Sequence, residues 1–102
     1  MRGGGGLRLV LTQEADDDLV GITFYTLDNF GLVQADRYIA GLEAFLLELP
    51  ACQYRLKPVQ SRTSGYWRAV YQSHVVFARK VRDTLLVVRI LHDRMNPNHY
   101  LP

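Results

Sequence analysis

The second half of the chain holds the side chains best suited to chemistry on a charged partner. Arg68, Arg79 and Arg89 each lie in a stretch of alternating apolar and polar residues. A guanidinium group binds carboxylates and phosphates through paired N–H groups, so three of them on one surface would hold an anionic partner. His92 and Tyr100 follow in the sequence and could carry a proton to or from a reacting oxygen. These residue types predict an anion-binding surface.

No residue set in the sequence predicts a metal or a cofactor. Cys52 is the single cysteine, so it can form no internal disulfide and belongs to no cluster of thiol ligands. The acidic run from Glu14 to Asp18 favours a helix start, where carboxylates interact with the positive end of the helix dipole. A lone cysteine suits a reducing compartment, and no apolar run approaches the roughly 20 residues of a membrane span. We therefore expect a cytoplasmic protein without metal, cofactor or membrane partner.

Charge is divided unequally between the two halves of the chain. Residues 1–50 hold three arginines against eight acidic residues, a net charge of −5. Residues 51–102 hold nine basic residues against two acidic ones, a net charge of +7. Segregation of this kind influences which partners a protein attracts more than it influences the fold. The basic half favours an acidic protein, a phosphate backbone, or both.

Periodicity predicts two helices in the first half. Residues 7–11 alternate as a short strand, and Thr12 stands where the N-cap of a helix over residues 13–29 is expected. Gly31 supplies the turn, and residues 32–49 repeat apolar side chains at helical spacing until a proline ends the helix. Two helices joined by so short a turn form an antiparallel hairpin.

Strands dominate the second half. Residues 51–65 show no regular pattern and are predicted to form a loop. Residues 66–71, 74–80 and 84–92 read as three strands at hairpin spacing. The first strand must join the same sheet, because an isolated strand is not stable. The expected fold is α+β in the order β-α-α-β-β-β, with the antiparallel helical hairpin packed on one face of a mostly antiparallel four-stranded sheet.

Length and composition fit one small domain. The chain has 102 residues, of which 48% are hydrophobic, an ordinary fraction for a folded protein. Residues 1–6 include four consecutive glycines and are predicted to be a flexible leader or an expression remnant, whereas residues 7–102 form the domain. A core of this size is modest, so a partner that covers apolar surface would add stability.

Alternation along the strands assigns side chains to the two faces of the sheet. The residues of the last strand predicted to pack on the helices are Leu86, Val88, Ile90 and His92. Leu85, Val87 and Arg89 alternate with them and are assigned to the opposite, open face. Arg68 and Arg79, from the two preceding strands, are assigned to that same face. A surface that is part apolar and part arginine has the composition of an interface core and predicts a bound partner.

The helical hairpin carries more aromatic residues than a small core readily buries. The residues concerned are Phe24, Tyr25, Phe30 and Tyr38. Some of them are predicted to be exposed in a groove that accepts an apolar segment of a partner, the alternative being that all four belong to the core.

Five short motifs follow one another along the chain: A-D-D-D-L-V-G-I at 15–22, F-G-L-V-Q-A-D-R-Y at 30–38, L-E-A-F-L-L-E-L-P at 42–50, Y-W-R at 66–68 and R-I-L-H-D-R-M at 89–95. In this order, and on this order of elements, they resemble the ParE family of bacterial toxins, within the wider ParE/RelE group. The resemblance covers about residues 7 to 101. Asn96 stands where the family usually has an acidic residue.

The resemblance implies a toxin of a type II toxin–antitoxin system, neutralised by a ParD-like or similar cognate antitoxin. Several ParE toxins inhibit DNA gyrase and stall replication, and the family is associated with plasmid stabilisation. The expected partners are therefore the antitoxin, DNA gyrase and nucleic acid reached through a gyrase–DNA assembly, with higher-order toxin–antitoxin assembly as a further possibility. RelE-like relatives are endoribonucleases that cut messenger RNA on the ribosome, and this is the alternative function.

Gyrase binding, antitoxin binding and the ribonuclease alternative each involve a different set of residues. Target-binding residues on the gyrase interpretation are Arg68, Arg79, Arg89, Arg94 and Met95. Antitoxin-binding residues are Phe24, Tyr25, Phe30, Tyr38, Phe77, Leu85 and Val87. Catalytic residues on the ribonuclease alternative are Arg68, Arg89, His92 and Tyr100. A binding inhibitor is favoured over an enzyme, because the sheet is poor in lysine and a tail after a proline would hold its acid–base groups loosely.

Overall fold

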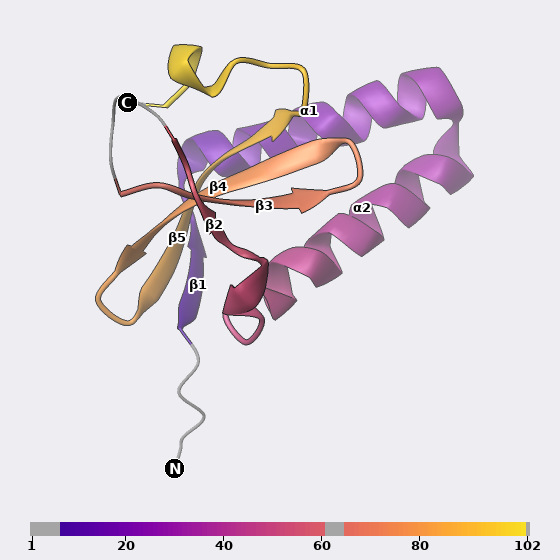
Figure 1. Cartoon of the computed structure of the whole chain (residues 1–102). Coiled ribbons are helices and arrows are strands. Elements are labelled where there is room, and N and C mark those ends of the chain that lie inside the picture. The colour runs from indigo at the N-terminus through magenta and orange to yellow at the C-terminus, as the bar shows by residue number, and fades with distance from the viewer. Residues whose placement is uncertain (1–6, 61–64, 102) are drawn as a thin grey trace.

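The computed structural model describes residues 7–60 and 65–101 and folds as two helices packed on a five-stranded sheet (Figure 1). The elements in chain order are β1 (Arg8–Leu11), α1 (Gln13–Phe30), α2 (Leu32–Glu48), η1 (Gln53–Arg55), β2 (Lys57–Pro58), β3 (Trp67–Tyr71), β4 (His74–Val81), β5 (Thr84–His92) and η2 (Pro97–His99). The predicted α+β order is confirmed. The predicted leader, residues 1–6, lies outside the described residues.

The sheet contains one strand more than expected. Its strand order is β1-β5-β4-β3-β2, and β1 runs parallel to β5 while the other neighbours are antiparallel. The additional strand, β2, has two residues and lies in the region predicted to be a loop. Only its pairing with β3 makes it a strand, and a two-residue segment leaves no alternation for sequence reasoning to detect.

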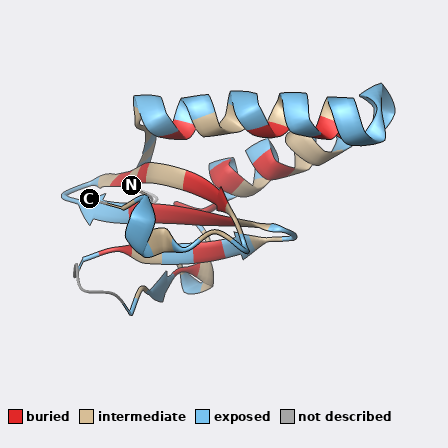
Figure 2. Ribbon diagram, turned by 90° about the horizontal axis from the view of Figure 1, so that it is seen from above, coloured by how far each residue is buried: buried red, intermediate tan, exposed pale blue. Residues whose placement is uncertain are grey.

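Local signals determine where both helices begin and end. The Thr12 hydroxyl accepts a hydrogen bond from the backbone N–H of Ala15 at 3.2 Å, which caps α1 as the sequence predicts. Gly31 joins the helices at a φ of +87°, a conformation that favours glycine. Figure 2 shows both helices covering the same side of the sheet, with their buried residues turned toward it.

The main core lies between the helical hairpin and the sheet. Its fully or nearly fully buried members are Ala15, Ile22, Leu42, Leu46 and Leu49 from the helices, and Ala69, Val76, Ala78, Leu85, Val87 and Ile90 from the sheet. A second, smaller cluster lies on the opposite face, where Val75, Phe77 and Leu91 are covered by Met95 and Leu101 of the C-terminal tail. The tail therefore folds back over the face that was expected to be open.

A β-bulge changes the face assignment in β5. Phe77 of β4 pairs with Arg89, but the next residue of β4, Ala78, pairs with Val87, so Val88 is an extra residue. An inserted residue moves every side chain before it to the other face. The predicted assignment is therefore wrong for Leu85 and Val87, which face the helices with 0% of their surface exposed.

The same bulge moves the residues predicted to pack on the helices. Leu86 pairs with Arg79 on the open face, and Val88 packs against the second cluster, so both assignments to the helix side are wrong. The assignments of Ile90, His92 and Arg89, which follow the bulge, are correct.

The charge division of the sequence becomes a division between layers. The helices α1 and α2 carry all eight acidic residues of the first half and a single base, Arg37. The sheet and its connections carry most of the basic residues. Within the described part of the chain, neither helix is long and apolar enough to cross a membrane.

Candidate functional site

Strand register gathers basic residues on the sheet face opposite the helices. Arg68 of β3 pairs with Phe77 of β4, and Phe77 pairs with Arg89 of β5, so these three residues form one row across the sheet. Arg79 lies two residues beyond Phe77 on β4 and therefore on the same face. This confirms the predicted placement of the three arginines on one face.

Arg68 and Arg79 are exposed on this face. The guanidinium carbon of Arg79 lies 5.5 Å from the ring centroid of the buried Tyr66, a stacking contact that orients the side chain. No carboxylate of the described residues, which include every Asp and Glu of the chain, lies within ion-pair distance of either arginine. Both cations are therefore available to an anionic partner.

Arg89, in contrast, is held within the molecule. Its Nε and Nη2 atoms donate to the two carboxylate oxygens of Asp18 in α1 at 2.8 and 2.9 Å, and the Ile90 N–H donates to the same carboxylate at 2.9 Å. The side chains of Arg89 and Asp18 are only 22% and 15% exposed. Its hydrogen bonds to the Asp18 carboxylate raise the pKa of Arg89. The salt bridge between Arg89 and Asp18 therefore joins α1 to the part of the β5 edge that does not pair with β1.

The C-terminal tail contacts Arg89 as well. The guanidinium carbon of Arg89 lies 5.3 Å from the ring centroid of Tyr100. Arg94 is exposed, whereas Met95 is half-buried against the second cluster, and a shallow hollow runs between the tail and Arg68. Of the predicted target-binding set, Arg68, Arg79 and Arg94 are accessible.

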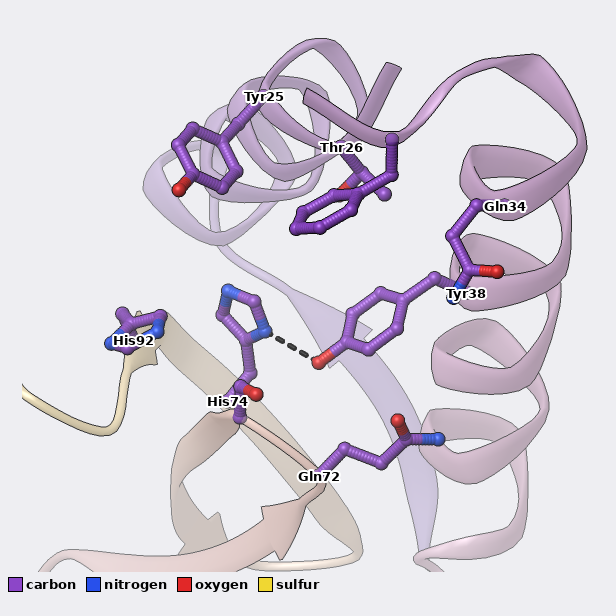
Figure 3. Close-up of a pocket in the computed structure, with 9 residues that line it drawn as sticks. Tyr25, Thr26, Gln34, Tyr38, Gln72, His74 and His92 are labelled. Carbon is purple, nitrogen blue, oxygen red and sulfur yellow. Dashed lines mark hydrogen bonds between the residues drawn. The ribbon is translucent and has the colours of Figure 1, made fainter. Parts of the chain in front are cut away.

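A pocket of about 270 Å³, called here the histidine pocket after His74 and His92 in its lining, lies between the helical hairpin and the end of the sheet. Figure 3 shows Tyr38 of α2 and His74 of β4 pointing toward each other, with the Tyr38 hydroxyl 2.7 Å from His74 Nδ1. The His92 ring lies against His74 with 5.5 Å between centroids, and its Nδ1 is 3.1 Å from a carboxylate oxygen of Asp93. Strand register explains the contact between the two histidines, because His74 and His92 are paired residues at the ends of β4 and β5.

Burial shifts the pKa values of two residues that line this pocket, His74 and Tyr38. Loss of solvent lowers the pKa of His74, and the neighbouring His92 lowers it further, while Asp93 opposes them. Burial also raises the pKa of Tyr38. The lowered pKa of His74 favours its neutral form, and the Tyr38 hydroxyl and His74 Nδ1 share one hydrogen bond.

The four residues of the ribonuclease alternative are only partly brought together. Arg89 and Tyr100 are in contact and Arg68 shares their face of the sheet, but His92 is paired with His74 on the helix side. The residues that line the histidine pocket within the described chain include no Lys or Arg that could stabilise a phosphorane. Among the described residues, no three His, Cys, Asp or Glu side chains are grouped so that they could hold a metal ion.

The predicted antitoxin-binding residues divide into three groups. Phe24, Tyr25 and Phe30 are 60–64% exposed around the turn of the hairpin, in keeping with the expected apolar surface. Tyr38 is half-buried and engaged by His74. The remaining three are buried, since Phe77 is 4% exposed beneath the tail and Leu85 and Val87 belong to the main core. The bulge in β5 is the reason the last two fall on the wrong face.

Sequence reasoning missed three residues of this region. Asp18 belongs to the acidic run that favours a helix start, yet it also lies three residues after Ala15 and four before Ile22. This spacing places it on the inward stripe of α1 and is the signal for its contact with the sheet. His74 carries no signal of its own, because its partner across the sheet, His92, depends on strand register. Lys57 lies in the region without a periodic signal.

Comparison with known proteins identifies the family. The model of a family described as "ParE toxin of type II toxin-antitoxin system, parDE" matches residues 9–97. The chain is 38% identical over 88 residues to Toxin ParE of Escherichia coli, covering 85% of each chain. It is 32% identical over 91 residues to Toxin ParE1 of Caulobacter vibrioides, covering 89% of this chain and 94% of the relative.

Solved structures share the fold at low sequence identity. A chain of the chromosomal ParDE system from P. aeruginosa aligns with a TM-score of 0.75 at 15% identity, covering 87% of this chain and 98% of the other. A chain of the toxin–antitoxin complex RelBE2 from Mycobacterium tuberculosis aligns with a TM-score of 0.67 at 18% identity, covering 85% and 98%. From its sequence and its fold together, the chain belongs to the ParE toxin family of type II toxin–antitoxin systems.

Proposed function

We propose that this toxin inhibits DNA gyrase and thereby blocks replication, acting by binding and not by catalysis. Membership of the ParE family supports the proposal. The observation that carries it is the sheet face on which Arg68 and Arg79 stand exposed without a carboxylate partner among the described residues. A gyrase–DNA assembly presents acidic protein and phosphate side by side, and a guanidinium group suits both.

Within the target-binding set, the residues have different tasks in this proposal. Arg68, Arg79 and Arg94 contact the target, and Met95 contributes apolar surface beside them. Arg89 holds the tail and α1 in place, because its guanidinium is already bound to Asp18. Contact with nucleic acid follows where the basic face meets the DNA held by gyrase.

Supercoiling of relaxed plasmid by gyrase, with and without the purified chain, tests the proposal. We expect inhibition by the unaltered chain, and a higher concentration for half-inhibition with Arg79→Ala. Arg37→Ala is the matched control, because it removes one exposed arginine from the helix layer. Supercoiling that is untouched by the unaltered chain, or lost inhibition with both variants alike, would contradict the assignment.

Primer extension on translated messenger RNA tests the ribonuclease alternative in the same preparation. The stacking of Tyr100 on Arg89 favours this alternative, since it places an acid–base group beside a cation. Inhibited supercoiling with intact messenger would eliminate ribonuclease activity. Cleaved messenger with normal supercoiling would eliminate gyrase as the target.

We further propose that a cognate antitoxin of ParD-like or similar type covers the hairpin surface formed by Val20, Phe24, Tyr25, Phe30, Leu32 and Val33. All six are large apolar side chains that are more than half exposed, a costly arrangement for a free monomer. The two helices that carry these side chains, α1 and α2, are acidic, so the antitoxin segment should be apolar with basic flanks. Acidic parts of the antitoxin would meet the sheet face, and the use of two faces permits higher-order toxin–antitoxin assembly.

Binding of the antitoxin encoded beside this chain tests the hairpin surface. Phe24→Asp places a charge at its centre and should weaken the complex by at least tenfold, about 1.4 kcal/mol. Leu47→Asp is the matched control, an exposed leucine near the other end of α2. Equal affinity of the two variants would place the antitoxin elsewhere.

A further inference from the structure

A hollow at the β2 edge of the sheet combines three cations with apolar walls. Its volume is about 600 Å³, and its lining consists of Phe45, Arg55, Lys57, Pro58, Arg68 and Val70. It lies where β2 pairs with β3, at the end of the row described above that Arg68 occupies.

Lys57 and Arg68 are an unusual pair in this hollow. They are direct partners across the antiparallel β2–β3 pair, and like charges directly opposite one another destabilise a sheet. Both are exposed, and no carboxylate among the described residues lies within ion-pair distance of either. An anion bound between them would relieve the repulsion.

Arg55 is held at the side of the hollow by its neighbours. Its Nη1 donates to a carboxylate oxygen of Glu48 at 3.0 Å, and its guanidinium carbon lies 5.4 and 5.8 Å from the ring centroids of Phe45 and Tyr54. Tyr54 itself is 73% exposed and lies next to Arg55, at the side of the hollow. The side of the hollow therefore offers a largely exposed aromatic ring in contact with Arg55, and the hollow itself holds Lys57 and Arg68, which have no carboxylate partner among the described residues.

We propose that the Lys57–Arg68 hollow binds the phosphodiester backbone of single-stranded nucleic acid, with a base stacked on Tyr54. Free cations that follow a backbone, beside an aromatic ring on which a base can lie, form the recognised arrangement for single strands. An acidic protein would use the cations alone and leave the ring uncovered. Arg79, the diagonal neighbour of Arg68 on the same face, continues the positive track toward β4.

Fluorescence anisotropy with dye-labelled twelve-nucleotide oligothymidine and oligouridine, each titrated with the full chain at several salt concentrations, tests the inference. Each backbone contact to a single strand contributes a slope of about −0.7 to the dependence of log K on log salt. Three backbone contacts, made by Lys57, Arg68 and Arg79, predict a slope of about −2. The two oligonucleotides separate DNA from RNA, and preferential binding of either one supports the site.

Substitutions divide the charge contribution from the stacking contribution. Lys57→Ala should reduce affinity by about fivefold and make the slope shallower by about 0.7. Tyr54→Ala should reduce affinity by about tenfold with an unchanged slope, because stacking releases no counterions. Arg37→Ala, on the opposite layer, should change neither quantity.

Several results would overturn the inference. These are no binding at low salt, tighter binding of a twelve-base-pair duplex than of either single strand, competition by polyglutamate as strong as that by the oligonucleotides, or equal losses with Arg37→Ala and Lys57→Ala. The assay contains no gyrase, so its failure would leave the gyrase proposal standing. Failure of gyrase inhibition would equally leave this site standing.

Discussion

At the scale of single residues, the contact between Asp18 and Arg89 joins the two layers of the molecule. The first strand, β1, pairs only with Thr84–Val87, so the rest of β5 would present an open edge. Asp18 covers that edge by accepting from the Ile90 N–H and from the Arg89 side chain. An arginine in the middle of a basic surface is thus structural, while its exposed neighbours are free to bind.

Arg89→Ala should lower the free energy of unfolding by about 2 kcal/mol, because Asp18 keeps a partly buried charge and loses its bidentate partner. Chemical denaturation monitored by circular dichroism measures the change. Arg79→Ala is the control, and we expect a change within about 0.5 kcal/mol for this exposed residue. Equal stability of the two variants would show that the Asp18 contact contributes little.

The half-buried His74 should make the fold sensitive to acid. Burial and the neighbouring His92 hold its pKa below the ordinary value of about 6.5, so the unfolded chain binds this proton more readily than the folded chain does. Stability is therefore complete above about pH 7 and declines as the pH falls through 6.5, until the lowered pKa of the folded state is passed.

His74→Gln should flatten this decline, since the glutamine cannot take up a proton. Melting temperatures between about pH 7.5 and 5 provide the measurement. His99→Gln changes an exposed histidine in the tail and should leave the decline as it is. An unaltered profile in His74→Gln would assign the acid sensitivity to other groups.

At the scale of elements, α2 packs closely on the sheet at one glycine. A Cβ atom at Gly41 would overlap the hydroxyl of Tyr71 on β3, whose ring also contacts Tyr38 and Phe45. A tyrosine packed between two aromatic rings has little room to move aside. Close approach of the helix backbone to the sheet therefore depends on the absence of a side chain at this position.

Gly41→Ala should destabilise the fold by about 1–3 kcal/mol through this overlap, despite the better helix propensity of alanine. Gly21→Ala is the matched control within α1, where a Cβ meets no atom within 4 Å. There the change should stabilise the fold by about 0.5–1 kcal/mol. Thermal melts of the two variants should consequently move in opposite directions, and movement in the same direction would contradict the packing argument.

At the scale of the whole molecule, opposite charges occupy opposite layers. The acidic helices and the basic sheet face give two surfaces with different demands on a partner, which is why the antitoxin and target proposals can use different faces. The tail completes the sheet face, because Met95 and Leu101 cover Phe77 and Leu91 where no helix does.

Ending the chain after Asn96 should uncover this second cluster. Loss of the packing by Leu101 is expected to reduce the free energy of unfolding by about 1–3 kcal/mol and to increase the binding of a hydrophobic dye. His99→Ala, which changes an exposed tail residue and keeps the cover, should leave both quantities unchanged. A truncated chain as stable as the unaltered one would show that packing of the tail on the second cluster contributes little to stability.

Local signals in the sequence were enough for both helices, for every strand except β2, and for the composition of the surfaces. The apolar spacing of α2, the Thr12 cap and the glycine between the helices act within one or two helical turns, so they can be read without tertiary information. The same holds for the alternation that places Arg68 and Arg79 on one face, because neither β3 nor the register around it contains an irregularity.

Tertiary structure alone decided how the strands meet. The bulge at Val88 leaves no mark in the pattern of an apolar strand, yet it moves Leu85 and Val87 into the core and leaves Arg89 on the open face. The pairing of His74 with His92, of Lys57 with Arg68, and of Arg89 with Asp18 likewise joins residues far apart in the chain. Each pairing depends on register and packing between elements, whereas periodicity reports only the order within one element.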